Sequence, residues 1–136
     1  MKRSYLVTER DIRRFSQAIG APEPRKAADG RLIAEPLFCQ VFMFEDVPVS
    51  ELASDGSPKE INVDIPAKRT VGGGSDFEIF GPVFSGDTLT VHSKLKGVTE
   101  KSGKSGTLFL VQVETEFTNQ QGQQIARETA TYVKRD

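Results

Sequence analysis

The chain has 136 residues, which is enough for one domain with a moderate core, so we treat residues 1–136 as a single domain. The formal net charge is −1 and the basic residues are spread along the chain, which argues against nucleic acid as a major partner. The single cysteine, Cys39, leaves no disulfide framework and no thiolate metal cluster.

The N-terminal residues MKRSYLVTERDIRR lack the apolar core of a signal peptide. No window of the sequence approaches the length of a membrane span. We therefore expect a soluble, cytoplasmic protein.

The first predicted element is an amphipathic helix that starts after Thr8. Thr8 is a favourable N-cap, and Asp11 follows three positions later. Four apolar residues then recur at helical spacing on one face: Ile12, Phe15, Ala18 and Ile19. Gly20, followed by two prolines, ends this helix.

A second, short helix is predicted from Pro36 to Phe44. Pro36 suits the first helical turn, where a missing N–H costs nothing. The residues from Leu37 to Phe44 are apolar on nearly every side, which is typical of a helix buried all round. Such a helix needs strands that wrap around it.

The region from Val47 to Arg69 is the least regular part of the sequence. Its prolines and the run SDGS predict a surface excursion, and the alternation of Ile61, Val63 and Ile65 predicts a short edge strand. A strand from Ser75 to Phe80 is expected after a run of three glycines.

The C-terminal half predicts three long strands joined by two turns. Apolar and polar residues alternate from Leu89, and again from Phe109 to Phe117, while the last strand covers 125–134. The turns are predicted at 101–106 and 119–122. Short turns between consecutive strands give an antiparallel meander with one buried face. Together with the two helices predicted before it, this sheet predicts an α+β fold.

Three motifs in this order resemble the MaoC-like hydratases and dehydratases, and above all their catalytically degenerate N-terminal half. The motifs are Gly73-Gly74-x-x-Phe77-x-x-x-x-Pro82, Gly86-Asp87-x-Leu89 and Phe117-Thr118-Asn119-x-x-Gly122. The resemblance covers about residues 5–135. It implies a single hotdog domain, in which a long curled antiparallel sheet wraps around a central buried helix.

The resemblance breaks at the catalytic dyad. Active members carry Gly-Asp-x-Asn-Pro-x-His after the first helix, and Gly20 and Pro24 keep their places in this pattern. Ala21 stands where the catalytic Asp is expected, and Lys26 stands where the catalytic His is expected. Hydration of an enoyl thioester needs an acid–base pair within reach of one water. The only histidine, His92, lies far downstream on the polar face of a predicted strand, where we expect it to be exposed.

Other residues offer weaker candidate sites. Hotdog thioesterases often place an acidic residue or Gln on the buried helix, so Glu35 and Gln40 are candidates, although a structural role is expected for both. Asp87 is a third candidate, but a side chain that caps a turn is the main expectation. Cys39 is expected to fill the core.

Substrate binding is assigned to three short segments. Pro36 opens the predicted buried helix, whose N-terminus would offer donors to a thioester oxygen. The glycines Gly72, Gly73 and Gly74 either approach a pantetheine arm or form a plain bend. Lys68 and Arg69 either meet the phosphates of coenzyme A or, as isolated basic residues usually do, lie on the solvated surface.

The resemblance implies a non-catalytic subunit of an (R)-specific enoyl-thioester hydratase or 3-hydroxyacyl dehydratase. An active MaoC-type partner would supply Asp and His in a heterodimer, and the isolated chain is expected to form a homodimer. The substrate would be a thioester of coenzyme A or of acyl-carrier protein, with no metal and no other cofactor. A homodimeric acyl-CoA thioesterase and a non-catalytic acyl-thioester binding protein remain open alternatives.

Overall fold

The computed structural model describes residues 2–54, 56 and 65–136. Within these residues there is one α-helix, α1 (Glu9–Ala18), and there are two short 3₁₀ helices, η1 (Phe38–Phe42) and η2 (Val49–Glu51). The strands are β1 (Lys2–Leu6), β2 (Arg69–Ile79), β3 (Thr88–Gly103), β4 (Gly106–Thr118) and β5 (Gln124–Arg135).

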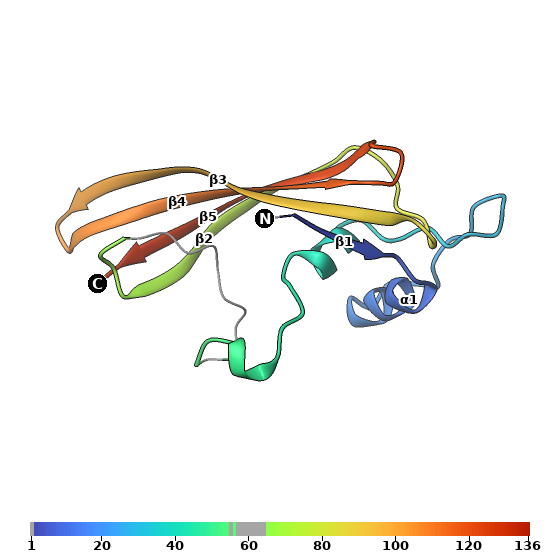
Figure 1. Ribbon diagram of the computed structural model, residues 1–136, viewed down its shortest axis with the longest axis horizontal. Coiled ribbons are helices and arrows are strands. Elements are labelled where there is room, and N and C mark those ends of the chain that lie inside the picture. The colour runs from blue at the N-terminus through green and yellow to red at the C-terminus, as the bar shows by residue number, and fades with distance from the viewer. Residues whose placement is uncertain (1, 55, 57–64) are drawn as a thin grey trace.

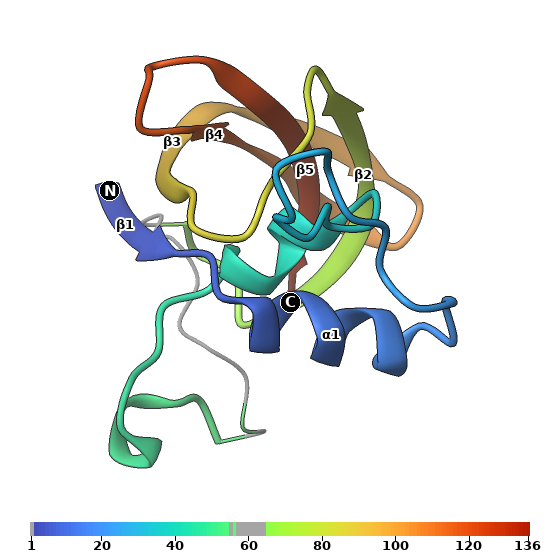
Figure 2. The ribbon, with the colours of Figure 1, turned by 90° about the vertical axis from the view of Figure 1, so that its right-hand side faces the viewer.

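All described strands form one antiparallel sheet in the order β1-β3-β4-β5-β2. The sheet is long and curled, and α1 and η1 lie on its concave side (Figures 1 and 2). β2 forms one edge of the sheet and β1 the other. The predicted α+β arrangement of a curled sheet around a short helical segment is therefore present.

The first helix begins as predicted, but only the N-terminal part of its predicted apolar face is buried. Thr8 and Asp11 form a reciprocal capping box, and Gly20 follows the helix with a positive φ of 69°. Ile12 is fully buried and Phe15 packs against the core, whereas Ile19 is 54% exposed. Ile19 is exposed because the helix ends at Ala18, before this residue completes the predicted stripe.

The prediction of a helix from Pro36 to Phe44 is wrong in its kind and its bounds. Leu37 has a left-handed backbone with a φ of 70°, and only a 3₁₀ helix from Phe38 to Phe42 follows. A left-handed residue interrupts α-helical hydrogen bonding, so Pro36 lies outside the helix. Phe38 and Phe42 are buried, but Val41 is 46% exposed, so the segment is buried on one side only.

The strands extend beyond their predicted ends. β1 was not predicted, and β2 begins at Arg69 because the three glycines lie within the strand, at a β-bulge between Gly72 and Gly74. The first hairpin is tighter than the predicted turn at 101–106, since β3 continues to Gly103 and β4 begins at Gly106. The second turn, at 119–122, is confirmed. The predicted edge strand at 61–65 falls almost wholly outside the described residues.

The core lies between the concave face of the sheet, α1, η1 and the segment before β3. Its largest fully buried side chains include Phe117 from the sheet, Ile12 from α1 and Leu32 from the loop after α1. Phe42 stacks on Tyr5 of β1 with ring centroids 4.9 Å apart. The unpredicted strand β1 thus helps to hold η1 against the sheet.

Candidate functional site

A small apolar pocket of about 190 Å³ lies between η1 and the β2 edge of the sheet. Three parts of the chain form it: the segment 33–39, the segment from Phe77 to Val83, and the start of β5 at Ile125 and Ala126. The sequence motif around Gly81-Pro82 therefore shapes the pocket, and edge strand β2 supplies one of its walls. An apolar hollow of this kind suits a hydrocarbon chain.

The pocket contains few groups that could do chemistry. Cys39 lines it, but burial raises the pKa of the Cys39 thiol to about 12, so the reactive thiolate is scarce at neutral pH. Glu35 and Arg25 are the charged residues of the lining, and Pro36 also belongs to it. Among the described residues, Glu35 is the one carboxylate of this mainly apolar lining.

The two positions where the resemblance places the catalytic dyad, Ala21 and Lys26, lie beside α1. Ala21 is half-buried and donates its backbone N–H to the Ser16 carbonyl over 2.9 Å, and it lines a shallow groove with Pro24. Lys26 is exposed and forms an isolated β-bridge with Leu32. These two positions carry a methyl group and an exposed cation, neither of which forms the base that hydration requires.

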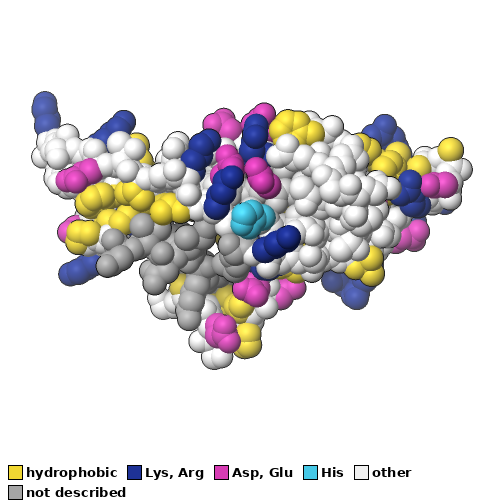
Figure 3. Space-filling view, turned by 45° about the horizontal axis from the view of Figure 1, so that its top comes forward, with side chains coloured by type: hydrophobic (Ala, Val, Ile, Leu, Met, Phe, Trp, Pro, Cys, Tyr) yellow, Lys and Arg dark blue, Asp and Glu magenta, His cyan; other side chains and the backbone are white. Residues whose placement is uncertain are grey.

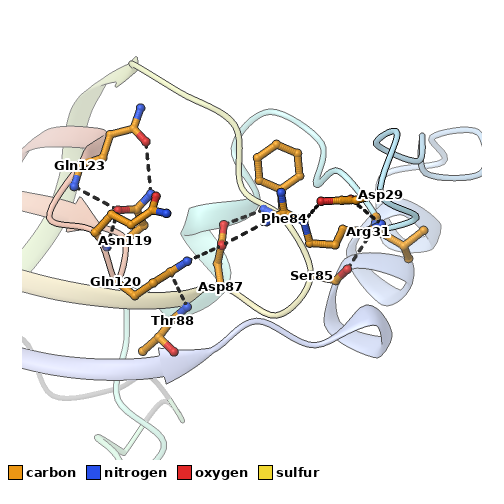
Figure 4. A network of polar contacts seen from close by, with 11 residues as sticks. Asp29, Arg31, Phe84, Ser85, Asp87, Thr88, Asn119, Gln120 and Gln123 are labelled. Carbon is orange, nitrogen blue, oxygen red and sulfur yellow. Dashed lines mark hydrogen bonds and ion pairs between the residues drawn. The ribbon is translucent and has the colours of Figure 1, made fainter.

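Asp87 caps a turn, as expected (Figure 4). Its Oδ2 accepts a hydrogen bond of 2.9 Å from the backbone N–H of Phe84, and its Oδ1 accepts a hydrogen bond of 3.0 Å from Nε2 of Gln120. Gln120 in turn accepts the N–H of Thr88, which fixes the start of β3 to the turn after β4. Both carboxylate oxygens are occupied and the side chain is 2% exposed, so its contacts are those of a structural residue.

Gln40 and His92 lie away from the pocket. Gln40 is exposed on η1, although it was expected to lie on a helix that is buried all round. His92 is exposed on β3, as expected, and is the one histidine visible among charged side chains in Figure 3. Glu116 pairs with it across the strands in the sheet register.

The predicted coenzyme A contacts lie far from the pocket. Lys68 precedes β2 and Arg69 begins it, while the pocket touches the opposite end of the strand at Phe77. Eight residues of strand separate Arg69 from Phe77, which is roughly 26 Å. Between them, Gly73 approaches β5 so closely that an added Cβ would stand 3.0 Å from the Thr131 carbonyl oxygen. The glycines therefore serve close strand packing as well as a bulge.

Glu128, a buried carboxylate on the concave face of β5, was not predicted as a candidate site residue. The signal was available, because Glu128 lies between Ala126 and Ala130 at strand spacing, and both alanines are small apolar residues. A charge at an apolar position of an alternating strand marks a candidate site.

Two negative findings concern the described part of the chain. No three His, Cys, Asp or Glu side chains there are grouped so that they could hold a metal ion. The helices described are all too short or too polar to cross a lipid bilayer.

Comparison with known families assigns the chain to a class. Residues 1–128 match the model of the FAS1-like, dehydratase domain region. Since the match spans most of the sequence, the chain belongs to this family of MaoC-like hotdog proteins. Among curated proteins, no sequence matches the chain.

Solved structures share the fold. A chain of the ChsH1–ChsH2 complex from Mycobacterium tuberculosis matches with a TM-score of 0.71 and 14% identity, over 99% of this chain and 83% of that one. A chain of the HadBC (3R-hydroxyacyl-ACP dehydratase) complex of the same organism matches with a TM-score of 0.66 and 20% identity, over 98% of this chain and 94% of that one. The (R)-hydratase PhaJ1 from Pseudomonas aeruginosa matches with a TM-score of 0.62 and 21% identity, over 100% of this chain and 79% of that one. The predicted hotdog fold is thereby confirmed.

Proposed function

We propose that this chain is the acyl-binding, catalytically degenerate subunit of an (R)-specific enoyl-thioester hydratase or 3-hydroxyacyl dehydratase. In the hydration direction, the hydroxyl of water bonds to C3 of a 2-enoyl thioester and a proton is delivered to C2. The partner subunit would supply the Asp and His that manage these protons, and this chain would hold the acyl chain.

The observation that carries this proposal is an apolar pocket without an acid–base pair in a member of a dehydratase family. Ala21 and Lys26 occupy the positions of the dyad, and the pocket beside η1 offers Glu35 as its only carboxylate. Family membership supports the reaction class, and the residues present support a binding role within it.

A second observation supports a paired assembly. The pocket volume of about 190 Å³ is below the roughly 300–1,000 Å³ typical of ligand sites. One wall is the edge strand β2, whose outer hydrogen-bonding side is open to another strand. A second hotdog on this edge would enlarge the pocket. The related HadBC and ChsH1–ChsH2 structures are complexes of two proteins, which is consistent with this arrangement.

The test is an activity assay of the chain alone and with candidate hotdog subunits that retain the Gly-Asp-x-Asn-Pro-x-His motif. We expect negligible hydration of crotonyl- and octenoyl-coenzyme A by the chain alone, because each acid–base group contributes about 10²–10⁴-fold. Co-expression with the correct partner should restore turnover. Replacing the partner's catalytic histidine should abolish it, whereas His92→Ala in this chain should leave it within about twofold.

Two controls separate the alternatives. Robust hydration by the chain alone that falls a hundredfold in His92→Ala, with the fold intact, would overturn the proposal. Release of free coenzyme A from acyl thioesters by the chain alone, lost in Glu35→Gln, would instead identify a thioesterase that uses the carboxylate of the pocket.

A further inference from the structure

A row of polar side chains crosses the concave face of the sheet. Ser93 of β3 and Thr115 of β4 are paired in the register, and their hydroxyl oxygens lie 2.9 Å apart. Thr115 is paired in turn with Glu128 of β5, and the Ser75 hydroxyl of β2 donates a hydrogen bond to Glu128 Oε1. The row thus spans four adjacent strands on the face that otherwise carries core residues such as Phe117.

Glu128 is the unusual member of this row. Its exposed fraction is 6%, and its Oε2 has no hydrogen-bond partner among the residues that the structure describes. Burial of a carboxylate oxygen without a donor is unfavourable, and such groups are rare in native proteins. The hydroxyl of Ser75 satisfies only Oε1, so Oε2 is a buried, unsatisfied acceptor on the inner face.

The unsatisfied acceptor belongs to a residue whose neighbours in the sheet line the apolar pocket. Phe77 and Ala126 both line the pocket; Phe77 is the register partner of Glu128, and Ala126 precedes it by two positions on the same face of β5. Two residues of strand correspond to about 7 Å. A chain that lies in the pocket and continues along β5 would therefore reach Glu128.

We propose that Glu128 binds a hydroxyl group carried on the acyl chain, remote from the thioester. This inference rests on the proposed function and names its substrate class: acyl thioesters with a hydroxyl beyond the carbons that react. A hydroxyl is the fitting donor because the neighbouring polar groups, Ser75, Ser93 and Thr115, are themselves neutral hydroxyls. The donated hydrogen bond would satisfy Oε2 without bringing a second charge into the core.

The test measures binding to the full chain by titration calorimetry with paired probes. The probes are octanoyl- and dodecanoyl-coenzyme A and their ω-hydroxy counterparts. At one chain length, we expect the hydroxylated probe to bind about ten- to a hundredfold more tightly, as for a hydrogen bond to a charged group. Glu128→Leu should remove this preference and leave the affinity for the plain probe unchanged or improved.

Two further variants keep the test decisive. Glu128→Gln preserves the shape and should reduce the preference, and Glu116→Gln, on the opposite face of the sheet, should retain it. If plain thioesters bind but no chain length shows a hydroxyl preference, the inference fails and the proposed function stands. If no thioester binds, both fail. If Glu128→Gln changes the molar mass of the assembly, Glu128 is an interface residue and the inference is overturned.

Discussion

Phe42 anchors η1 to the sheet through aromatic contacts. It stacks on Tyr5 with ring centroids 4.9 Å apart and meets Phe38 edge-on at 5.6 Å. Phe38 continues the group to Phe15 of α1 at 5.8 Å. These contacts connect β1, η1 and α1, so the position of the pocket depends on Phe42.

We predict that Phe42→Ala lowers the free energy of unfolding by about 3–5 kcal/mol, because the substitution leaves a cavity in the core. Chemical denaturation measures this change. Phe44→Ala is the matched control, since Phe44 is 50% exposed and lies two positions away. We expect the control to cost less than about 1 kcal/mol, and equal losses in both variants would contradict this account of η1.

The sequence could predict single residues whose roles are local. The cap at Thr8 and the turn at Asp87 depend on partners within three residues, so both were predictable. The role of Glu128 depends on Ser75, which is 53 residues away, and on a register that only the folded sheet defines. For the same reason, the sequence did not indicate that Gln120 would bind Asp87.

At the scale of elements, β3 and β4 are joined on the convex face by an ion-pair cluster. Glu114 forms ion pairs with two lysines: its Oε1 lies 2.8 Å from Nζ of Lys94, and its Oε2 lies 3.5 Å from Nζ of Lys96. The side chain of Glu114 is 12% exposed. The hydrogen bond from Lys94 lowers the pKa of the Glu114 carboxyl below its ordinary value of 4.5, against the opposing effect of burial.

A depressed carboxyl pKa gives a definite pH dependence. The contribution of Glu114 to stability is fully present above its unfolded pKa near 4.5 and is lost as the pH falls through the lower, folded value. We therefore predict that Glu114→Gln lowers the midpoint of thermal unfolding at neutral pH. The difference from the unmodified protein should shrink as the pH falls below about 4.5.

Thermal melts across pH 3–7 check this prediction. Glu100→Gln, at an exposed position of β3, is the control and should leave the melting curves nearly unchanged. A Glu114→Gln difference that is constant across this range would show that packing, and not the charge, is responsible.

The strands of the C-terminal half were predictable because period-two alternation and short turns are local signals. The kind of helix at η1 was not, because an apolar run does not reveal that Leu37 takes a left-handed backbone. β1 was missed since its pattern is half-exposed and its pairing with β3 spans more than 80 residues, as in the contact of Ser4 with Thr90.

At the scale of the whole molecule, edge strand β2 is the element that we expect to pair with another chain. All of its residues are exposed except Phe77, which is half-buried. A long exposed edge invites pairing with another strand. We predict that the isolated chain is a homodimer, with twice the 15.0 kDa mass of one chain by light scattering.

A pair of lysine substitutions tests where the copies meet. Val71 lies on β2 and is 51% exposed, and Leu95 lies on the interior strand β3 and is 45% exposed. Val71→Lys should weaken the dimer at least tenfold, because it places two like charges near each other across the new seam. Leu95→Lys should leave the dimer intact. A monomer at all concentrations would contradict pairing through β2.

The place of His92 has a spectroscopic consequence. As the only imidazole of the chain, exposed on β3, it contributes one pair of carbon-bound ring-proton signals, Hδ2 and Hε1, to a proton NMR spectrum of any complex. Every other imidazole resonance in such a complex belongs to the partner. Titration with substrate would then distinguish any histidine that a partner contributes from this one reference pair.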